Sequence, residues 1–492
     1  MVKIAFVSQP RDPVVAAPAQ RGSVTTVLWE LATRIARRHE AMVFAPQAPG
    51  QAAEESYGSL LGICRVPVWR TLHKALDLGT GILGWHSPYF ASSAYFREYG
   101  LGVARALQRY RPDIVHLQNH SQFLPLFRRA VPGARLIMHV HDELHSLLPP
   151  DPIRARLQDV TAIVTPSEFV SRRIEARMSY MAGRIHTIGN GVDTATFRPG
   201  RHDAATGRGG LRILYVGRVS PEKGVHILAA AFAHLLDAGE HAELDIVGPA
   251  GLLPLSQVKL LARDRQMAAL GQFYGSGFWG SLDRQLLRAR SGYRRYIESL
   301  LPTGSRARVR FLGQLSREAV IDCYHRSDVL VIPSLCEEPF GLPIAEGLAC
   351  ALPCVASNAG GIPELIEHEK TGLLVARGDA AGLADALQQL AAEPAARERL
   401  GRLGRERAER LLDWSLPAAR LEALYERTLA YASGENSPPA HLPLPEGLER
   451  HYLLPRVNQP VTQTPVDPRT VRRESQNGTA GLAYLGAAEP EP

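Results

Sequence analysis

Two glutamates stand eight positions apart in the stretch CEEPFGLPIAE, with a Phe-Gly pair and a proline between them. The segment that carries Glu346 has a helical composition, and its proline suits a first helical turn, where the missing N–H would have been unpaired anyway. We therefore expect the amides of Phe340, Gly341 and Leu342 at a helix N-terminus, which favours anions through the helix dipole. Gly341 lacks a Cβ that would hold a phosphate away. Glu338 precedes this turn, so the pattern indicates a phosphate site flanked by two carboxylates.

A single glutamate near a helix N-terminus is commonly no more than a favourable charge–dipole pair. A second stretch, YVGRVSPEKG, supports the chemical interpretation, because a strand ends there and Arg218 and Lys223 lie on the following loop. Both loops come at the carboxyl edge of the same predicted sheet. Two cations beside an anion-binding helix end would neutralise a diphosphate. Glu346 could then reach the ribose hydroxyls of a nucleotide, and Glu338 the opposite end of the ligand.

The elements that position these residues alternate between short apolar strands and helical patterns. This alternation predicts parallel sheets built from βαβ units. A polar, Gly-rich segment at 198–210 separates two such series and is interpreted as a linker. Two doubly wound sheets in tandem are expected, with a cleft at the carboxyl ends of their strands. The predicted strands lie at 3–8, 41–46, 113–118, 135–141, 161–167, 184–190, 212–218, 243–248, 308–313, 328–333, 353–357 and 372–376, with helices near 24–38 and 225–237.

Two regions depart from this rhythm. Residues 250–307 form an insert that is longer than a crossover helix requires. Two interpretations of it stay open: a basic amphipathic surface that meets anionic lipid or a lipid-phosphate acceptor, or a helical hairpin that packs its aromatic side chains. Residues 433–492 are rich in Pro, Gly, Glu and Thr and are predicted to be a disordered tail. The interleaved residues of the insert are Phe273, Tyr274, Phe278, Trp279, Tyr293 and Tyr296, with Arg284, Arg288, Arg290, Arg294 and Arg295.

Composition excludes several classes of protein. A length of 492 residues favours two or three domains, and a formal charge of +7 suits anion handling without implying nucleic-acid binding. No apolar run reaches the roughly 18 residues that span a bilayer, and the N-terminus lacks a signal peptide's cleavage region. The five cysteines have no metal-ligand spacing and are interpreted as reduced thiols. We expect a cytoplasmic protein with no metal and no cofactor, in which peripheral contact with the inner membrane face is left open.

These motifs resemble a known family. Glu338 and Glu346 match the E-x7-E motif of retaining glycosyltransferases of family 4, which have the two-domain GT-B fold, and VGRVSPEKG resembles that family's donor-phosphate loop. The resemblance runs over roughly residues 2–430 and includes IGNGVDTATFRP, the segment that leads into the interdomain linker. It implies two Rossmann-like domains facing a cleft. The implied parts are an acceptor-side domain at 1–198, a nucleotide-sugar-binding domain at 211–410 with the insert, and a helix at 411–432 that crosses back to the first domain.

The resemblance also implies a role for each matching residue. Arg218 and Lys223 would hold the donor's diphosphate and stabilise it as it leaves. Glu338 would bind the hydroxyls of the donor sugar, and Glu346 the nucleotide ribose. His141, in MHVHDELH, matches the family's sugar-contacting histidine, although two further histidines in this stretch leave its register open. The implied substrate contacts are completed by Gly22, Ser23, Asn190, Phe340, Gly341 and Leu342.

One position departs from the family pattern. The first strand-to-helix loop, which holds Gly22 and Ser23, has Arg21-Gly22 where the family commonly has Gly-Gly. Acceptor contacts at this helix N-terminus are therefore less firmly implied than donor contacts.

The expected reaction moves a sugar from a nucleotide-diphosphate sugar to an unidentified acceptor with retained configuration. The chain has no Asp-x-Asp motif, so Arg218 and Lys223 rather than a metal would stabilise the leaving diphosphate. A GT-B sugar-nucleotide epimerase or hydrolase and a non-catalytic binding or surface-layer protein stay open as alternatives. Two G-x-G-x-x-G stretches, at 79–84 and 275–280, do not follow a convincing strand, which argues against an oxidoreductase.

Overall fold

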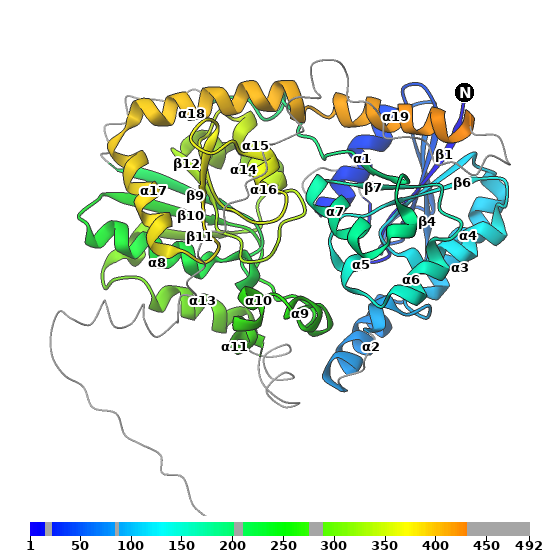
Figure 1. Ribbon diagram of the computed structural model, residues 1–492, viewed down its shortest axis with the longest axis horizontal. Helices are drawn as coiled ribbons and strands as arrows, with labels where there is room; N and C mark the ends of the chain where they lie inside the picture. The colour runs from blue at the N-terminus through cyan, green and yellow to red at the C-terminus, as the bar shows by residue number, and fades with distance from the viewer. Residues whose placement is uncertain (15–21, 84–87, 201–209, 275–288, 431–492) are drawn as a thin grey trace, which may run out of the picture. The chain divides into compact units, whose positions relative to one another are not determined.

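The computed structural model describes residues 1–14, 22–83, 88–200, 210–274 and 289–430. The chain divides into two units, residues 1–457 and 458–492, and the description below concerns the first. The described residues form two α/β sheets with helices packed on them (Figure 1). Within these ranges, no helix is both long and apolar enough to cross a membrane. The tail that the sequence predicts to be disordered lies outside the described residues.

The first sheet has eight strands in the order β3-β4-β2-β1-β5-β6-β7-β8. Every pairing is parallel except that of β3 with β4, which is antiparallel. The central strand β5 is buried at all five positions, as expected for a parallel strand covered on both faces. The strands are β1 (Lys3–Val7), β2 (Glu40–Pro46), β3 (Glu54–Tyr57), β4 (Leu61–Val66), β5 (Ile114–Gln118), β6 (Arg135–His139), β7 (Ala162–Thr165) and β8 (Ile185–Thr187).

Helices cover this sheet and form its crossovers. The hydroxyl of Ser167 caps α7 by accepting a hydrogen bond from the amide of Val170, which satisfies one of the unpaired N–H groups of a helix start. The helices are α1 (Ser23–Ile35), α2 (Arg70–Leu83), α3 (Arg97–Tyr110), α4 (Leu124–Ala130), α5 (Leu144–Leu147), α6 (Pro150–Leu157) and α7 (Glu168–Arg177).

The second sheet has six strands, all parallel, in the order β11-β10-β9-β12-β13-β14. The strand order runs outward in both directions from β9. The loops that carry Arg218, Lys223 and Glu338 follow the carboxyl ends of β9 and β12, at this switch point. The strands are β9 (Leu211–Val216), β10 (Ala242–Val247), β11 (Val309–Gly313), β12 (Val329–Ile332), β13 (Cys354–Ser357) and β14 (Gly372–Val375).

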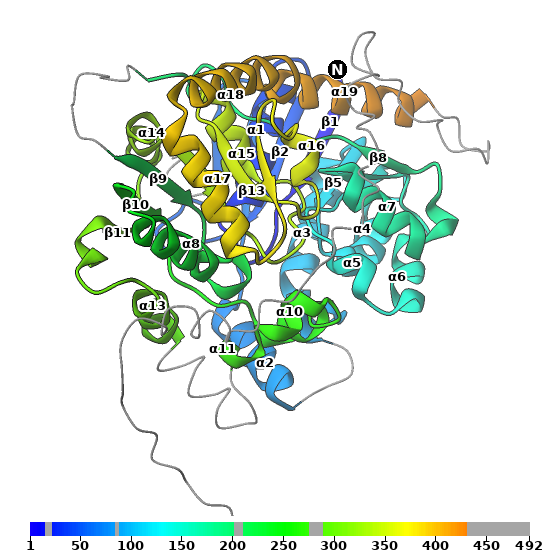
Figure 2. The same cartoon turned by 60° about the vertical axis from the view of Figure 1, so that its left-hand side comes forward.

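Two long helices, α8 and α17, lie side by side on one face of the second sheet (Figure 2). Their apolar residues, among them Leu228, Phe232, Leu383 and Leu387, belong to the same buried cluster. The helices of this half are α8 (Val225–Asp237), α9 (Leu255–Leu261), α10 (Arg265–Ala269), α11 (Gly271–Tyr274), α13 (Ala289–Ser299), α14 (Arg317–Arg326), α15 (Leu342–Ala349), α16 (Ile362–Leu365), α17 (Ala380–Ala392) and α18 (Pro394–Arg407).

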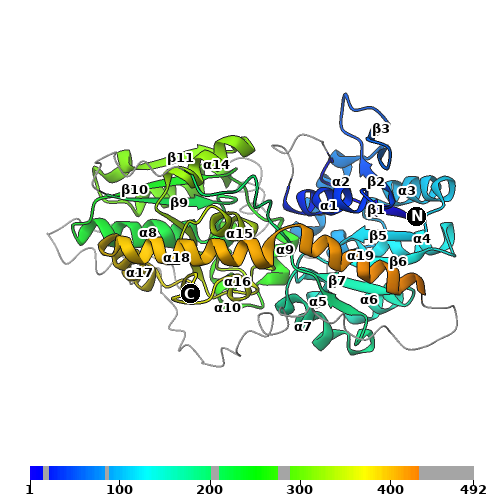
Figure 3. The ribbon, with the colours of Figure 1, turned by 90° about the horizontal axis from the view of Figure 1, so that it is seen from above.

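The last described helix, α19 (Ser415–Ala430), packs on the first half of the chain. A π-helical turn, Ala408–Leu412, joins α18 to it, and α19 then lies beside α1 (Figure 3). Trp414, Leu421 and Leu424 are buried with the core residues of the first sheet. The end of the second half therefore completes the core of the first.

The expectation of two Rossmann-like sheets is confirmed, and each predicted strand overlaps a strand of the structure. The sequence did not predict β3, β4, α2 and α3, which fill the gap between the second and third predicted strands. The first G-x-G-x-x-G stretch falls at the end of α2 and follows no strand. The second lies in residues that the structure does not describe.

Candidate active site

A buried ion pair joins the two loops that the sequence singled out. Lys223 Nζ donates a hydrogen bond to Glu338 Oε1, and the side chains are 24% and 9% exposed. Ser334 Oγ donates to the same carboxylate oxygen at 2.6 Å. Burial works against both charges, yet their attraction raises the pKa of Lys223 and lowers that of Glu338. Both groups are therefore charged near neutral pH, and Glu338 Oε2 accepts no hydrogen bond from a described residue.

Arg218 is held beside this pair by a second buried carboxylate. Its Nη2 donates to Glu222 Oε1 at 2.7 Å, and the side chain of Glu222 is only 1% exposed. Tyr274 Oη, from α11 in the insert, donates to Glu222 Oε2 at 2.8 Å. Ser220 Oγ donates to Glu222 Oε1 at 2.7 Å. Glu222 thus fixes the guanidinium of Arg218, and the insert supplies one of its supports.

The turn before α15 presents unpaired backbone donors. Gly341 is the N-cap of α15 and has a φ of 105°, a conformation that favours glycine. Within the described ranges, the amides of Phe340, Gly341 and Leu342 donate to no protein acceptor. The turn is pinned from the other side, because Gly361 N donates to Glu338 O at 2.7 Å. The geometry is that of a helix N-terminus open to an anion.

Glu346 lies in the second turn of α15, apart from the ion pair. Tyr324 Oη donates to its Oε2 at 2.8 Å, and the side chains of Glu346 and Glu338 do not share a hydrogen-bond partner among the described residues. Burial raises the pKa of Glu346 to about 7, although the hydrogen bond from Tyr324 and the charge of Arg317 lower it. The two glutamates of the motif therefore have different electrostatic environments, one firmly ionised and one poised near neutrality.

This difference predicts a pH dependence of stability. Since the pKa of Glu346 is raised by folding, its contribution is fully present below the unfolded value of about 4.5 and is lost as pH rises through about 7. Between pH 6 and pH 8 the group should lower the free energy of unfolding by about 1 kcal/mol. Urea denaturation at pH 6 and at pH 8 should show that the free energy of unfolding of Glu346→Gln lacks this decrease.

A matched control is Glu55→Gln, because hydrogen bonds from Arg65 and Tyr57 lower the pKa of Glu55. That replacement should leave the slope between pH 6 and pH 8 as in the wild type. An unchanged slope in Glu346→Gln would contradict the assignment of a titrating carboxyl.

His141 lies just after β6, at the carboxyl edge of the first sheet. Its Nε2 is 2.6 Å from Gln118 Oε1, and its backbone N donates to Asn119 Oδ1 at 2.9 Å. Burial lowers the pKa of His141 to about 3, so the ring is neutral near pH 7. Because Gln118 Oε1 can only accept, Nε2 carries the proton, which leaves Nδ1 to accept a hydrogen bond. His139 is one of the two nearby histidines that could be confused with His141 in the motif. It is buried, and its ring stacks on that of His141.

The remaining predicted residues lie at separate places. Asn190 follows β8, is 9% exposed, and its Oδ1 has no hydrogen-bond partner within the described part of the chain. Gly22 is the N-cap of α1 and Ser23 is its first residue, which is exposed. Among the described residues, none of these three forms a hydrogen bond with the Lys223–Glu338 pair.

Contacts between the two halves occur at the loops of the site. Ser167 Oγ donates to Pro339 O at 2.6 Å, directly beside Glu338. The amides of Glu168 and Phe169, at the start of α7, donate to the carboxylate of Glu364 at 2.9 and 2.8 Å. The carboxyl edges of both sheets therefore meet at the turn that holds the ion pair.

The described aromatic residues of the insert are packed rather than exposed. Tyr293 is buried and hydrogen bonds to His226, and Phe273 and Tyr296 pack against the same core. Arg294 pairs with Glu298 and lies over the ring of Phe311. This arrangement favours the packed interpretation for the described residues. Binding to anionic lipid stays a prediction, and Phe278, Trp279, Arg284 and Arg288 lie outside the described residues.

Sequence reasoning missed three residues of the site. Glu222 lies in the stretch YVGRVSPEKG, four residues after Arg218. This spacing, which brings opposite charges together on a helical turn, was the signal for an ion pair between them. Tyr274 and Tyr324 were not assigned to the site, because each approaches it from a distant segment. No spacing in the sequence reveals such contacts.

Two family profiles match the chain in tandem. The profile described as Glycosyltransferase Family 4 matches residues 24–196, and that described as Glycosyl transferases group 1 matches residues 203–407. The boundary between them falls in the segment that separates the two sheets.

Similarities to individual proteins agree with these matches. Spore coat protein SA of Bacillus subtilis is 26% identical over 87% of this chain and 100% of its own length. Glycogen synthase of Mycobacterium tuberculosis is 28% identical over 70% of this chain and 75% of its own length. Among solved structures, Anabaena HepE in complex with UDP and glucose superposes with a TM-score of 0.60 at 18% identity, covering 87% of this chain and 100% of that one.

Proposed function

The chain belongs to the GT-B glycosyltransferases of the family 4 type, and we propose that it transfers a sugar from a nucleotide-diphosphate donor with retention of configuration and without a metal. One observation carries this proposal: Arg218, Lys223 and the unpaired amides at 340–342 converge on one loop cluster. The relatives named above support a nucleotide-sugar donor, since one is a glycogen synthase and one was solved with UDP.

The donor's diphosphate fits these cationic and N–H groups. When the bond between the anomeric carbon and the diphosphate oxygen breaks, negative charge grows on the leaving group. Arg218 and Lys223 are already charged and already held by Glu222 and Glu338, so they stabilise that charge without rearranging. A fixed positive environment of this kind takes the place of a divalent metal.

The donor sugar and ribose have separate partners. Glu338 Oε2 accepts from hydroxyls of the sugar, and His141 Nδ1 accepts from a hydroxyl on the side of the first sheet. Glu346 accepts from the ribose. The acceptor oxygen attacks the anomeric carbon from the face that the diphosphate leaves, and its proton passes to a phosphate oxygen of the leaving group. The products are a glycoside and a nucleoside diphosphate.

A non-catalytic function is the weaker candidate. The likeness to a spore coat protein names that class, but a protein without chemistry has no need of a buried Lys–Glu pair beside unpaired amides. An epimerase or hydrolase would release free sugar or nucleotide without an acceptor.

Donor binding gives the first test of the proposal. A ligand present at 100 times its dissociation constant stabilises a protein by about 2.7 kcal/mol. We expect one of the UDP-, GDP- or ADP-sugars to raise the melting temperature, and the matching free nucleoside, which lacks phosphate, to leave it unchanged. The absence of a shift with all three series would contradict a nucleotide-sugar site.

Metal independence gives the second test. Because Arg218 and Lys223 neutralise the diphosphate, an excess of EDTA should leave the rate of transfer largely intact. The rate is measured as release of nucleoside diphosphate before and after chelation. Complete loss of activity that magnesium or manganese restores would show that a metal carries this role.

A further inference from the structure

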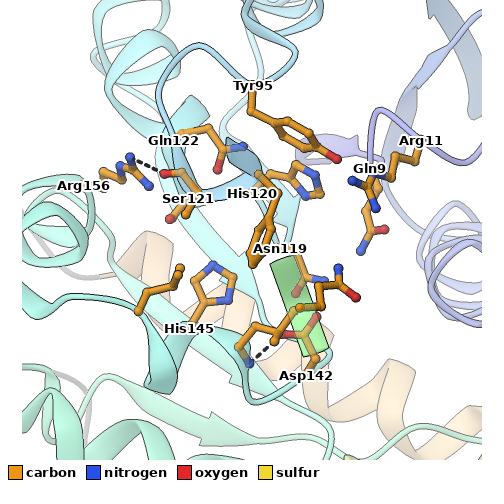
Figure 4. Close-up of a pocket in the computed structure, with 15 residues that line it drawn as sticks. Gln9, Arg11, Tyr95, Asn119, His120, Ser121, Gln122, Asp142, His145 and Arg156 are labelled. Carbon is orange, nitrogen blue, oxygen red and sulfur yellow. Dashed lines mark hydrogen bonds between the residues drawn. The ribbon is translucent and has the colours of Figure 1, made fainter. Parts of the chain in front are cut away.

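A polar pocket opens at the carboxyl edge of the first sheet, beyond the residues assigned above. It is lined by residues that follow β5 and β6 and by side chains from α6 and the segment before α3 (Figure 4). Its volume is about 100 Å³, well above the roughly 10–15 Å³ that one water needs. Asn119 lines it and also accepts the hydrogen bond from the amide of His141. The pocket is therefore adjacent to the histidine assigned to the donor sugar.

Arg156, on α6, brings a charge into this pocket without a matching anion. Its Nη2 donates to Ala91 O at 2.7 Å, and no carboxylate lies within ion-pair distance of it among the described residues. Burial lowers the pKa of Arg156, but a guanidinium stays charged at neutral pH. Arg156 is partly buried, and the described residues accept from only one of its five N–H donors. An anionic ligand in the pocket would accept from the others.

Two neutral side chains beside Arg156 are also buried without partners. Gln122 and His145 are each 8% exposed, and both line the pocket. Gln122 Nε2 and His145 Nδ1 have no hydrogen-bond partner within the described ranges. Burial lowers the pKa of His145 to about 4, so it is neutral near pH 7. Buried polar atoms are nearly always satisfied, and the oxygens of a ligand would satisfy these.

Two other charged side chains, Arg11 and Asp142, line the pocket. Arg11, on the side opposite Arg156 in Figure 4, pairs with Asp77 at 3.2 Å and lies over the ring of Tyr95. The carboxylate of Asp142 accepts from Asn119 Nδ2 at 3.2 Å and from Leu144 N at 3.0 Å. Both donors to Asp142 are neutral, and burial raises the pKa of this carboxyl to about 6. Asp142 forms no ion pair with Arg156 among the described residues, and Arg156 is the cation whose charge acts on His145.

We propose that this pocket binds an oxyanion group of the acceptor, a phosphate or a carboxylate, with Arg156 as its charged contact and Gln122 and His145 as neutral hydrogen-bond partners. The assignment rests on the proposed transferase function and names the class of its acceptor. The oxygens of an oxyanion accept hydrogen bonds from N–H donors of this kind, and a guanidinium binds such a group through two parallel hydrogen bonds. Gln257, from α9 in the insert, lines the same pocket, so the insert helps to enclose the acceptor's anionic end.

Equilibrium binding to the full chain tests the pocket without requiring catalysis. Glucose 6-phosphate and glucuronate are titrated as anionic probes, with glucose as the neutral control. We expect the two anions to bind and glucose to bind far more weakly. Arg156→Gln should weaken anion binding about tenfold or more, and Arg156→Lys, which keeps the charge, should lose less.

Two controls separate this pocket from other sites. Arg154→Gln changes an exposed arginine on the same helix and should bind the anions as the wild type does. Arg218→Ala removes a cation of the donor site and should keep the binding that depends on Arg156. Vesicles containing phosphatidic acid distinguish a lipid phosphate from a soluble one, because Arg156-dependent binding to vesicles alone would identify a lipid acceptor.

The outcomes separate this inference from the proposed function. If a sugar nucleotide is consumed but Arg156→Gln binds every anionic probe as the wild type does, the pocket assignment is wrong and the transferase function stands. If no anionic probe binds the wild type, the assignment is wrong as well. If Arg156-dependent binding occurs but no sugar nucleotide is turned over, the assignment to an acceptor is overturned together with the function.

Discussion

Arg218→Ala is expected to reduce the rate of sugar transfer by about 100-fold or more. In the proposed reaction this guanidinium stabilises the leaving diphosphate, and removal of one such preorganised group costs about that much. Glu222, whose side chain is 1% exposed, would lose the cation that forms an ion pair with it among the described residues. The variant should therefore also be less stable, so the rate is measured at a temperature where circular dichroism shows it to be folded.

The chain offers a closely matched control for this replacement. Arg212 lies on β9, near the end opposite to the one that Arg218 follows, and pairs with Asp328 at 2.8 Å. Its side chain is 38% exposed, as is that of Arg218. Arg212→Ala should lose a comparable ion pair and keep the wild-type rate. Equal rates in Arg218→Ala and Arg212→Ala would show that Arg218 has only a structural role.

Lys223→Met is expected to lower the free energy of unfolding by about 3 kcal/mol. The replacement leaves the carboxylate of Glu338 buried with a neutral donor, Ser334, but without its cation, and breaking a buried pair in this way costs about 3–5 kcal/mol. We expect the lower end because Lys223 is 24% exposed. Urea denaturation measures the loss.

The double replacement Lys223→Met/Glu338→Gln separates stability from catalysis. With both charges gone, much of the lost stability should return, because a buried pair gains little over neutral side chains. The double variant should still be impaired in transfer by at least the factor expected for Arg218→Ala, since neither the diphosphate nor the sugar finds its partner. A stable double variant with wild-type turnover would refute the roles of both residues.

Sequence patterns predicted most strands of the two sheets for a physical reason. Strand β12, for example, is buried at every position, and its continuous apolar run is distinctive. The missed strand β3 is a polar edge strand with alternating exposure, and its partner β4 includes a glycine and an arginine. Their pairing is set by tertiary contacts, which no local pattern reveals.

The candidate site was predictable where it depends on loops that follow buried strands. Arg218 and Lys223 follow β9, and Glu338 follows β12, so neighbouring strands bring them to one edge. The pairing within the cluster was not predictable, because Lys223 and Glu338 are 115 residues apart. No pattern in the sequence links the insert to the site. In the structure, however, Tyr274 from α11 donates a hydrogen bond to Glu222, the carboxylate that fixes Arg218.

Arg156 illustrates a further limit of the sequence. It stands on a short helix rich in proline and arginine, where its spacing is that of an ordinary exposed residue. Only the fold reveals that Arg154 is exposed, whereas Arg156, two residues later, is partly buried and lines a pocket. The chemistry of the pocket arises from burial and from missing partners, both of which are properties of the packed chain.

Turnover of a sugar nucleotide by the purified full chain tests the central claim most directly. The donor that gives the largest stabilisation is incubated with the protein and EDTA, and the release of nucleoside diphosphate is followed together with the anomeric configuration of the glycoside product. The account predicts release by the wild type and by Arg212→Ala, at least about 100-fold slower release by Arg218→Ala, and a product with the configuration of the donor. Wild-type protein that binds the donor but releases no nucleoside diphosphate with any sugar or sugar phosphate as acceptor would contradict it.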